Sequence, residues 1–314
     1  MTTARVLVAG DANLDLVLRG DVVPRFGQVE QLLESAELVL GSSAGICAAG
    51  LARLGVDVSL VARIGADLFG DETSRLLSAA GVDTRAVRRV DEGTGFSVIL
   101  SSADRAILTF TGALAGLTAD EVADAVTSAE ATHLHVASYF LVPELARELP
   151  GVLARVRERG VTTSLDTNWD PAERWAGVAE CLPHLDLLLP NAQEAVALAR
   201  ALGGDPADAV AAAKLLADRG PIVVVKDGAD GGFAVAEGRV VRAAGLTVDV
   251  VDTTGAGDSF DAGFLAAWLD GRDLAEAVRW ATIAGSLSTG GTGGTGHQAT
   301  RAEILAETGA ETGA

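Results

Sequence analysis

The stretch VDTTGAGDSFDAGF at residues 251–264 is the most informative in the chain, because it joins a strand end, a glycine-rich turn, an acidic residue and a helix start. Gly255, Ala256 and Gly257 carry almost no side chain, so the backbone N–H groups of this turn can approach an anion closely. The start of the helix adds the positive end of its dipole, and Asp258 stands beside it as a candidate base. A strand-turn-helix junction capped by Asp258 would have the same pattern, so this stretch alone leaves both interpretations open.

The composition is that of a globular protein, with 49% hydrophobic and 21% charged residues in 314. A chain of this length forms one large domain with an appended element, or two domains. The formal charge of −19 repels nucleic acid and anionic membranes, so neither is expected as a partner. We expect a cytoplasmic protein, because the sequence has no transmembrane run of about 18 apolar residues and no signal-peptide pattern. Cys47 and Cys181 lie in apolar contexts and are expected to be buried thiols.

Short β-branched runs alternate with amphipathic runs along the chain, which is typical of a parallel sheet between layers of helices. The candidate strands are ARVLVAG, DVSLVARIG, THLHVAS, VTTSLDT, LDLLLP and PIVVVKDG. The predicted helices span residues 44–54, 70–80, 119–129, 143–159, 192–202, 206–219, 257–270 and 273–289. The pattern therefore predicts a doubly wound α/β fold with a mostly parallel central sheet flanked by helices.

Two segments near residues 12–40 and 93–112 interrupt this rhythm with the alternation typical of antiparallel strands. In the second segment, SADR at residues 102–105 predicts a hairpin turn. We expect the segments to pair into a small antiparallel β lid over the mouth of the main domain, and its exposed strand edges favour a homodimer. The predicted division is an α/β domain at 1–11, 41–92 and 113–300, a lid at 12–40 and 93–112, and a C-terminal helix end and tail at 301–314.

Polar residues follow several predicted strands, where ligands bind in doubly wound sheets. GDANLD places Asn13 and Asp15 after the first strand, either to hydrogen-bond a polyhydroxylated ligand or to form an Asx turn. In LLLPNAQE, Asn191 and Glu194 have the spacing of a capping box, and the same pair offers oxygen atoms to hydrated magnesium. Lys226 precedes a glycine-rich turn in VVVKDGADGG. Each segment alone leaves its structural and functional interpretations open.

Taken in order, these segments resemble the PfkB/ribokinase family of carbohydrate kinases from about residue 5 to about residue 296. GDANLD resembles the opening sugar-binding segment of the family, and LGSSAGICAAGLARLG followed by VARIGADLFG resembles its first signature. NAQE, KDGADG and DTTGAGDSFDAGF resemble the later nucleotide and catalytic segments. The resemblance implies a ribokinase-like fold and an ATP-dependent kinase that phosphorylates a hydroxyl of a sugar or sugar-containing small molecule.

The resemblance also implies a role for each candidate residue. Asp258 would accept the proton of the substrate hydroxyl as that hydroxyl attacks the γ-phosphate of ATP. The backbone N–H groups of Gly255, Ala256 and Gly257 would form the anion hole. The other implied roles are nucleotide contacts from Asn191, Lys226, Gly228 and Gly231; an adenine pocket from Ile283, Ala284 and Leu287; water-mediated magnesium binding by Asn191 and Glu194; and monovalent cation binding, with potassium expected, by Asp252 and Thr254.

One departure from the family pattern concerns the substrate. Ser42 stands where ribokinase-like members usually have the second glycine of a pair, and Ile46 stands where they have an asparagine that contacts the sugar. Ile46 forms no side-chain hydrogen bond, and an unpaired buried hydroxyl costs roughly 1 to 3 kcal/mol. We therefore expect a ligand that is apolar or deoxy at this point, as a nucleoside or modified sugar is. The other expected substrate contacts are Asn13, Asp15, Ser43 and, in the lid, Arg105.

Three other functions remain as alternatives to a sugar kinase. A nucleoside kinase of the same family is favoured by Ile46. A catalytically degraded member that binds sugar or nucleotide as a regulator is suggested by Ile46 and Ser42, although Asp258 and the glycine turn are intact. A dinucleotide-dependent reductase is disfavoured, because the first strand ends in GDANLD and lacks GxGxxG.

Overall fold

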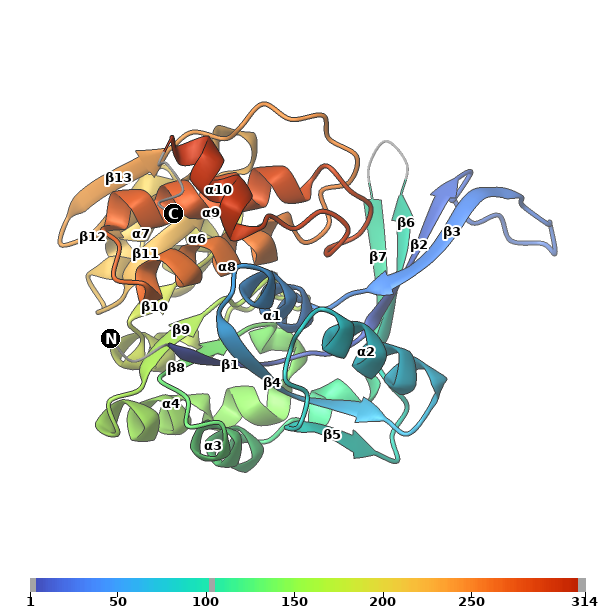
Figure 1. Cartoon of the computed structure of the whole chain (residues 1–314), viewed down its shortest axis with the longest axis horizontal. Coiled ribbons are helices and arrows are strands. Elements are labelled where there is room, and N and C mark those ends of the chain that lie inside the picture. The colour runs from blue at the N-terminus through green and yellow to red at the C-terminus, as the bar shows by residue number, and fades with distance from the viewer. Residues whose placement is uncertain (1–3, 102–104, 310–314) are drawn as a thin grey trace.

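A nine-stranded β-sheet forms the centre of the molecule (Figure 1). The structure is a computed structural model that describes residues 4–101 and 105–309 of the chain. From one edge to the other, the strands are β13 (Arg239–Ala243), β12 (Gly232–Ala236), β11 (Ile222–Lys226), β10 (Leu187–Leu188), β9 (Thr162–Leu165), β8 (His133–Val136), β1 (Arg5–Ala9), β4 (Asp57–Gly65) and β5 (Val87–Val90). The strands from β11 to β5 run parallel, whereas β12 and β13 are antiparallel at one edge.

Helices cover both faces of this sheet, because successive strand residues pack into opposite cores, as Leu7 and Val8 of β1 do. One face packs against α3 (Ala119–Ser128), α4 (Pro143–Glu158), α5 (Val178–Cys181), α6 (Ala192–Ala201) and α7 (Ala209–Ala217). The other packs against α1 (Ser43–Arg53), α2 (Leu68–Ala79), α8 (Ala256–Leu269), α9 (Leu274–Ser288) and α10 (Arg301–Thr308). This arrangement confirms the predicted doubly wound fold. All the predicted helices are present, and the largest shift is that of α7 against the predicted 206–219.

A smaller four-stranded sheet projects from this body (Figure 1). Its strands, in spatial order, are β3 (Leu33–Leu40), β2 (Leu14–Gly20), β6 (Phe96–Ser101) and β7 (Arg105–Phe110). Each hairpin is antiparallel, as predicted, but the two hairpins are joined by parallel pairing of β2 with β6. The reason is that β2 and β6 follow the parallel strands β1 and β5 and leave the main sheet in the same direction. The predicted SADR turn falls on residues 102–104, outside the described residues.

The prediction for the two cysteines is confirmed, and the C-terminal segment contains a separate short helix, α10. Cys47 and Cys181 are buried free thiols. The C-terminal helix ends at Thr308, and the tail from residue 310 lies outside the described residues. Across residues 4–101 and 105–309, no helix combines the length and the apolar character needed to cross a membrane.

The order of the strands reverses between β1 and β8. The chain proceeds from β1 to β4 and β5 on one side, and from β8 to β9, β10 and β11 on the other. At such a switch point, the loops after the two strands diverge and leave a crevice at the carboxyl ends. Asp11 follows β1 here, Ser138 follows β8, and the smaller sheet begins nearby at Leu14. The topology therefore positions a ligand site at this crevice.

Candidate active site

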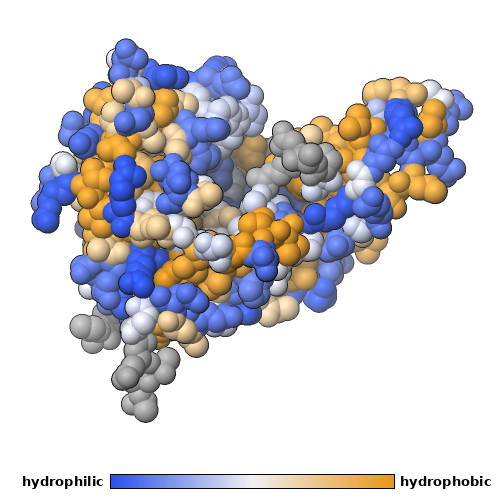
Figure 2. Space-filling model, turned by 90° about the horizontal axis from the view of Figure 1, so that it is seen from above, coloured by the Kyte–Doolittle hydropathy of each residue, from blue (hydrophilic) through white to orange (hydrophobic). Residues whose placement is uncertain are grey.

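A cavity of about 510 Å³ opens at this switch point, between the main body and the smaller sheet. Figure 2 shows the hollow between the body and the projecting strands. Thirteen of the residues singled out from the sequence line it together: Asn13, Asp15, Ser42, Ser43, Ile46, Asn191, Glu194, Lys226, Gly228, Thr254, Gly255, Gly257 and Asp258. We call it the acceptor cavity. The smaller sheet contributes Ser97, Ile99, Ile107 and Thr109 to its wall, and Trp169 comes from the loop after β9.

The glycine turn at the start of α8 requires its glycines. Gly255 has a φ of +72°, and a Cβ there would lie 2.5 Å from the Cα of Gly294. The Ala256 N–H donates to the Thr253 carbonyl at 3.3 Å. The N–H groups of Gly255 and Gly257 have no partner among the described residues, as is usual in the first turn of a helix. Both groups are therefore available to meet an anion.

Asp258 lies in the first turn of α8 and is 9% exposed. Burial raises its pKa to about 8, and the nearby charge of Asp166 acts in the same direction. Lys226 and a hydrogen bond with Ser43 act against this rise. A carboxylate whose pKa lies near neutrality can accept a proton from a reacting hydroxyl and release it again.

A buried ion cluster lies next to Asp258. The Lys226 Nζ is 2.7 Å from Asp166 Oδ2 and 3.1 Å from Asp261 Oδ2. Burial opposes the charge of Lys226, but the two carboxylates outweigh it and raise its pKa. Asp261 was not singled out from the sequence, although it stands three residues after Asp258 on the same helix face. The ammonium of Lys226, which is expected to contact the nucleotide, is held by these two carboxylates.

Asn191 and Glu194 form the predicted capping box at the start of α6. Asn191 Oδ1 accepts from the Glu194 N–H, and Glu194 Oε2 accepts from the Asn191 N–H. Burial and the charge of Asp166 raise the pKa of Glu194 to about 7, against an opposing effect of Lys226. The structural role of the pair is therefore confirmed, and both side chains also face the acceptor cavity. Among the described residues, Glu194 Oε1 has no hydrogen-bond partner.

A second cavity of about 490 Å³ adjoins the acceptor cavity and lies beside α9. Gly228 and Gly231 are among the residues that line it. The expectation for α9 is corrected: the lining residues are Thr282, Gly285, Ser286 and Thr289, whereas Ile283 and Ala284 are buried in the core and Leu287 packs against that core. The expected residues lie on the side of α9 that faces the core. A shift of one residue along a helix changes the direction of the side chain by about 100°, so a displacement of one position is enough to exchange the two faces.

The two cavities meet at the glycine turn. Lys226, Gly228, Thr253 and Gly257 line both of them. A Cβ on Gly257 would lie 3.3 Å from the Lys226 Cδ, so this glycine lets the helix start pack close to the lysine. A molecule in one cavity can therefore reach a molecule in the other across the N-terminus of α8.

The residues at the start of α1 explain the departure from the family pattern. Ser42 has a φ of +68°, a conformation that glycine adopts freely, and its Oγ caps the helix by accepting from the Gly45 N–H. Ile46 is buried and lies under the glycine turn, where a Cβ on Gly255 would be 3.0 Å from its Cγ2. Ile46 therefore supports the turn as well as lining the acceptor cavity.

Asn13 and Asp15 lie side by side at the start of the smaller sheet. The Asn13 Nδ2 donates to Asp15 Oδ1 at 3.2 Å. A Cβ on Gly41 would lie 2.2 Å from that same oxygen, so Gly41 makes room for the Asp15 carboxylate. Both side chains are buried and face the acceptor cavity. Arg105 begins β7, but its side chain lies outside the described part of the chain.

Asp252 fixes the segment just before the glycine turn. Its Oδ1 accepts from the N–H and the hydroxyl of Thr254 at 2.9 and 2.8 Å. Its Oδ2 accepts from the Gly293 N–H at 3.1 Å and from the Arg19 Nη2 at 3.0 Å. Arg19 comes from β2 of the smaller sheet and was not singled out from the sequence. This contact joins residues 233 positions apart, a distance at which sequence offers no signal.

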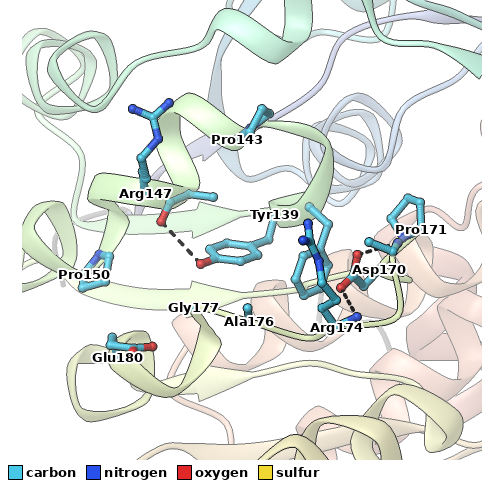
Figure 3. A pocket seen from close by; sticks show the side chains of 13 residues that line it. Tyr139, Pro143, Arg147, Pro150, Asp170, Pro171, Arg174, Ala176, Gly177 and Glu180 are labelled. Carbon is cyan, nitrogen blue, oxygen red and sulfur yellow. Dashed lines mark hydrogen bonds between the residues drawn. The ribbon is translucent and has the colours of Figure 1, made fainter.

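A larger cavity of about 650 Å³ lies elsewhere, beside α4 and the segment before α5 (Figure 3). Tyr139, Arg147 and Arg174 are among its lining residues. The Asp170 carboxylate at this cavity is already occupied by backbone N–H groups, including that of Arg174. None of the residues proposed from the sequence lines it. The anion-binding turn and Asp258 therefore assign the active site to the two smaller cavities.

Comparison with known proteins agrees with this arrangement. The pfkB family carbohydrate kinase pattern matches residues 3–301. An ATP-dependent ribose-1-phosphate kinase of Halopiger xanaduensis is 35% identical over 91% of this chain and 92% of its own length. A nucleoside kinase of Methanothermobacter thermautotrophicus is 28% identical over 90% and 88%. The crystal structure of ribokinase from Thermotoga maritima is similar with a TM-score of 0.81, at 25% identity and with 98% and 99% of the two chains covered. The chain belongs to the pfkB family of carbohydrate kinases.

Proposed function

We propose that this carbohydrate kinase transfers the γ-phosphate of ATP to a hydroxyl of a sugar or sugar-containing small molecule. The observation that carries the proposal is that two cavities meet at the start of α8, where Gly257 lines both and Asp258 lines one. The nucleotide occupies the cavity beside α9, and the acceptor lies under the smaller sheet. ATP is the donor because the Halopiger relative is ATP-dependent by name.

The chain supplies a base and an anion site at the point of transfer. Asp258 accepts the proton of the attacking hydroxyl, and its pKa of about 8 suits it to that exchange. The Gly255 and Gly257 N–H groups, with the dipole of α8, stabilise the charge on the transferring group. Lys226 holds Asp166 and Asp261 in place and contributes positive charge without leaving its ion cluster.

Magnesium is the proposed metal, with Asn191 and Glu194 holding its water shell. Carboxylate and amide oxygens are ligands that magnesium accepts, and Glu194 Oε1 is open among the described residues. A magnesium ion held there would neutralise negative charge on the phosphates of the nucleotide. A pKa of about 7 keeps Glu194 partly ionised near neutral pH, and a cation beside it favours the ionised form.

The acceptor cavity supports both a sugar and a nucleoside. Asn13, Asp15 and Ser43 offer hydrogen bonds to hydroxyls. Ile46 and Trp169 line the same cavity, and the exposed Trp169 ring offers a face on which an aromatic base can stack. These apolar groups favour a nucleoside as the second candidate acceptor.

We also propose that two copies of the chain associate through the smaller sheet, which acts as a lid. Each of its outer strands, β3 and β7, has one edge that pairs with no other strand in the described part of the chain, and such edges pair readily with another chain. Apolar side chains are exposed on this sheet and its β2–β3 connection, as the orange surface of Figure 2 shows. They are Val23, Phe26, Val29, Leu32, Leu33, Leu38, Ile107, Leu108 and Phe110.

The decisive experiment combines a substrate panel with Asp258→Asn. ADP formation is measured with ATP, magnesium and a series of pentoses, hexoses, sugar phosphates, sugar acids and nucleosides. Loss of the base lowers kcat by about 10²- to 10⁴-fold while the acceptor still binds. Asp270→Asn at the opposite end of α8 is the matched control. Wild-type kcat in Asp258→Asn contradicts the mechanism, and acceptor binding by calorimetry without ADP formation in the wild type favours a regulator.

A further inference from the structure

The Arg19–Asp252 ion pair joins the smaller sheet to the glycine turn. The guanidinium lies 3.0 Å from Asp252 Oδ2, and the two side chains are 28% and 10% exposed. Burial opposes ionisation of Asp252, but the N–H groups of Thr254 and Gly293, the Thr254 hydroxyl and the charge of Arg19 outweigh it and lower the pKa of Asp252. Asp252 is therefore a charged carboxylate close to the turn that must receive a phosphate.

The Asp252 carboxylate does not fit the monovalent cation expected from the family resemblance. Each of its two oxygens already accepts two hydrogen bonds. A carboxylate has about four lone-pair positions, so this set fills it. One of the four donors, Arg19, carries a full positive charge. Direct coordination of potassium by Asp252 would require Arg19 to leave.

The backbone of β2 directs Arg19 towards this position. The pairing of β2 with β3 changes register between Arg19 and Gly20, and such irregularities re-aim side chains near active sites. The pairing register also gives Arg19 the same sheet face as Asp15, since the two are four residues apart on one strand. Asp15 lines the acceptor cavity. Arg19 therefore belongs to the face of the smaller sheet that covers the active site.

We propose that Arg19 takes the place of the monovalent cation, so that phosphoryl transfer by this enzyme does not depend on potassium. The inference rests on the proposed kinase function. Arg19 neutralises Asp252, which would otherwise repel the phosphate, and it holds the segment that leads into Gly255. Because Arg19 is carried by the smaller sheet, its charge reaches the turn only when that sheet lies over the site. The position of the smaller sheet and the binding of an anion at the glycine turn are therefore coupled.

The first test measures kcat with choline chloride replacing potassium chloride at constant ionic strength. Wild-type kcat is expected to be the same in both salts. Arg19→Gln is expected to lose roughly 10- to 100-fold in choline, because the turn is misplaced and Asp252 is left unneutralised, and to regain part of that loss with potassium. Arg19→Lys keeps the charge and is expected to stay independent of potassium. Arg25→Gln is the matched control, since Arg25 pairs with Asp21 in the β2–β3 connection.

The second test is independent of turnover and measures thermal unfolding without substrates in the same two salts. The melting temperature of the wild type is expected to be equal in both, whereas potassium selectively stabilises Arg19→Gln. The inference is overturned if potassium strongly raises the kcat of the wild type or selectively raises its melting temperature. It is also overturned if Arg19→Gln behaves like Arg25→Gln in both tests. A wild type that forms no ADP with any acceptor contradicts the proposed function instead, and the unfolding measurement then still decides the role of Arg19.

Discussion

The Lys226 ammonium and the Asp166 carboxylate form a buried ion pair of 2.7 Å beside the proposed base. The side chains of Lys226 and Asp166 are 11% and 1% exposed, and Asp261 accepts a further hydrogen bond from the same ammonium at 3.1 Å. The pair connects the end of β11 to the segment after β9, and the contact of Lys226 with Asp261 connects both to the second turn of α8. One cation thus holds together three elements that shape the active site.

Lys226→Met is expected to destabilise the protein by about 3 to 5 kcal/mol, because it leaves buried carboxylates without a partner. It also removes the positive charge that lowers the pKa of Asp258. The midpoint of the rise of kcat/KM with pH should therefore move to a higher pH. Urea unfolding and the pH profile of kcat/KM measure the two effects. Lys214→Met on the exposed side of α7 is the control. An unchanged pH profile in a folded Lys226→Met variant would show that the cluster does not act on Asp258.

The activity of the wild type should rise with pH until Asp258 is ionised. The raised pKa of about 8 means that the free enzyme carries a protonated Asp258 at neutral pH, and only the ionised form accepts a proton. We expect kcat/KM to increase about tenfold per pH unit well below this pKa and to level off above it. Initial rates at saturating ATP and low acceptor concentration measure the profile. A rate that is flat across the neutral range would rule out Asp258 as the titrating base.

Asp258→Asn should make the protein more stable, and increasingly so as pH rises. The folded-state pKa of about 8 exceeds the usual 3.8, so ionisation in the unfolded chain favours unfolding between these two values. The stability that protonated Asp258 contributes is fully present below pH 3.8 and is lost progressively as the pH rises to about 8. Asparagine does not ionise, so the variant has no such loss. The unfolding free energy of Asp258→Asn minus that of the wild type should therefore increase by about 1.4 kcal/mol per pH unit between these two pKa values. Denaturant titrations at several pH values test this, and a constant difference would contradict it.

The glycine turn and the helices were predictable because their signals are local. Gly255 and Asp258 lie three residues apart in one stretch, and the apolar periodicity of each helix is contained within it. The Asp166–Lys226–Asp261 cluster joins positions 60 and 35 residues apart, and the Arg19 contact with Asp252 spans 233. Such contacts depend on strand order and register, which the hydrophobic pattern does not specify.

Some other features of the structure differ from the sequence prediction, each for a structural reason. The short edge strand β5 carries Arg88 and Arg89 at its centre and lacks a strand-like apolar pattern. The adenine-pocket set of Ile283, Ala284 and Leu287 was transferred by resemblance, and a displacement of one position exchanges the cavity face of α9 for its core face. The parallel pairing of β2 with β6 follows from where the two hairpins leave the main sheet, which the sequence of either hairpin does not contain.

The lid should carry the contacts between two copies of the chain. Leu108 of β7 is 59% exposed, so glutamate there leaves the fold intact and places a charge in the proposed interface. The wild type is expected to elute as a dimer, with Leu108→Glu shifted towards monomer, because a desolvated unpaired charge is costly. Light scattering coupled to gel filtration measures both. Leu215→Glu on α7, 40% exposed in the wild type, is the control. A monomeric wild type, or a dimer unaffected by Leu108→Glu, would exclude this interface.

Ile46→Asn should change which acceptor the enzyme prefers. Asparagine at this position offers a hydrogen bond to a hydroxyl that isoleucine leaves unpaired, and such a bond is worth about 1 to 3 kcal/mol, or roughly 5- to 150-fold in kcat/KM. We expect the ratio of kcat/KM for polyhydroxylated sugars over deoxy or nucleoside acceptors to rise in the variant. Ile46 also packs under Gly255, so part of the stability and of kcat is lost with every acceptor. Ile46→Val, which removes packing without adding a polar group, separates that general loss from the change in preference. If Ile46→Asn and Ile46→Val lower activity towards all acceptors in equal proportion, Ile46 supports the turn without selecting the substrate.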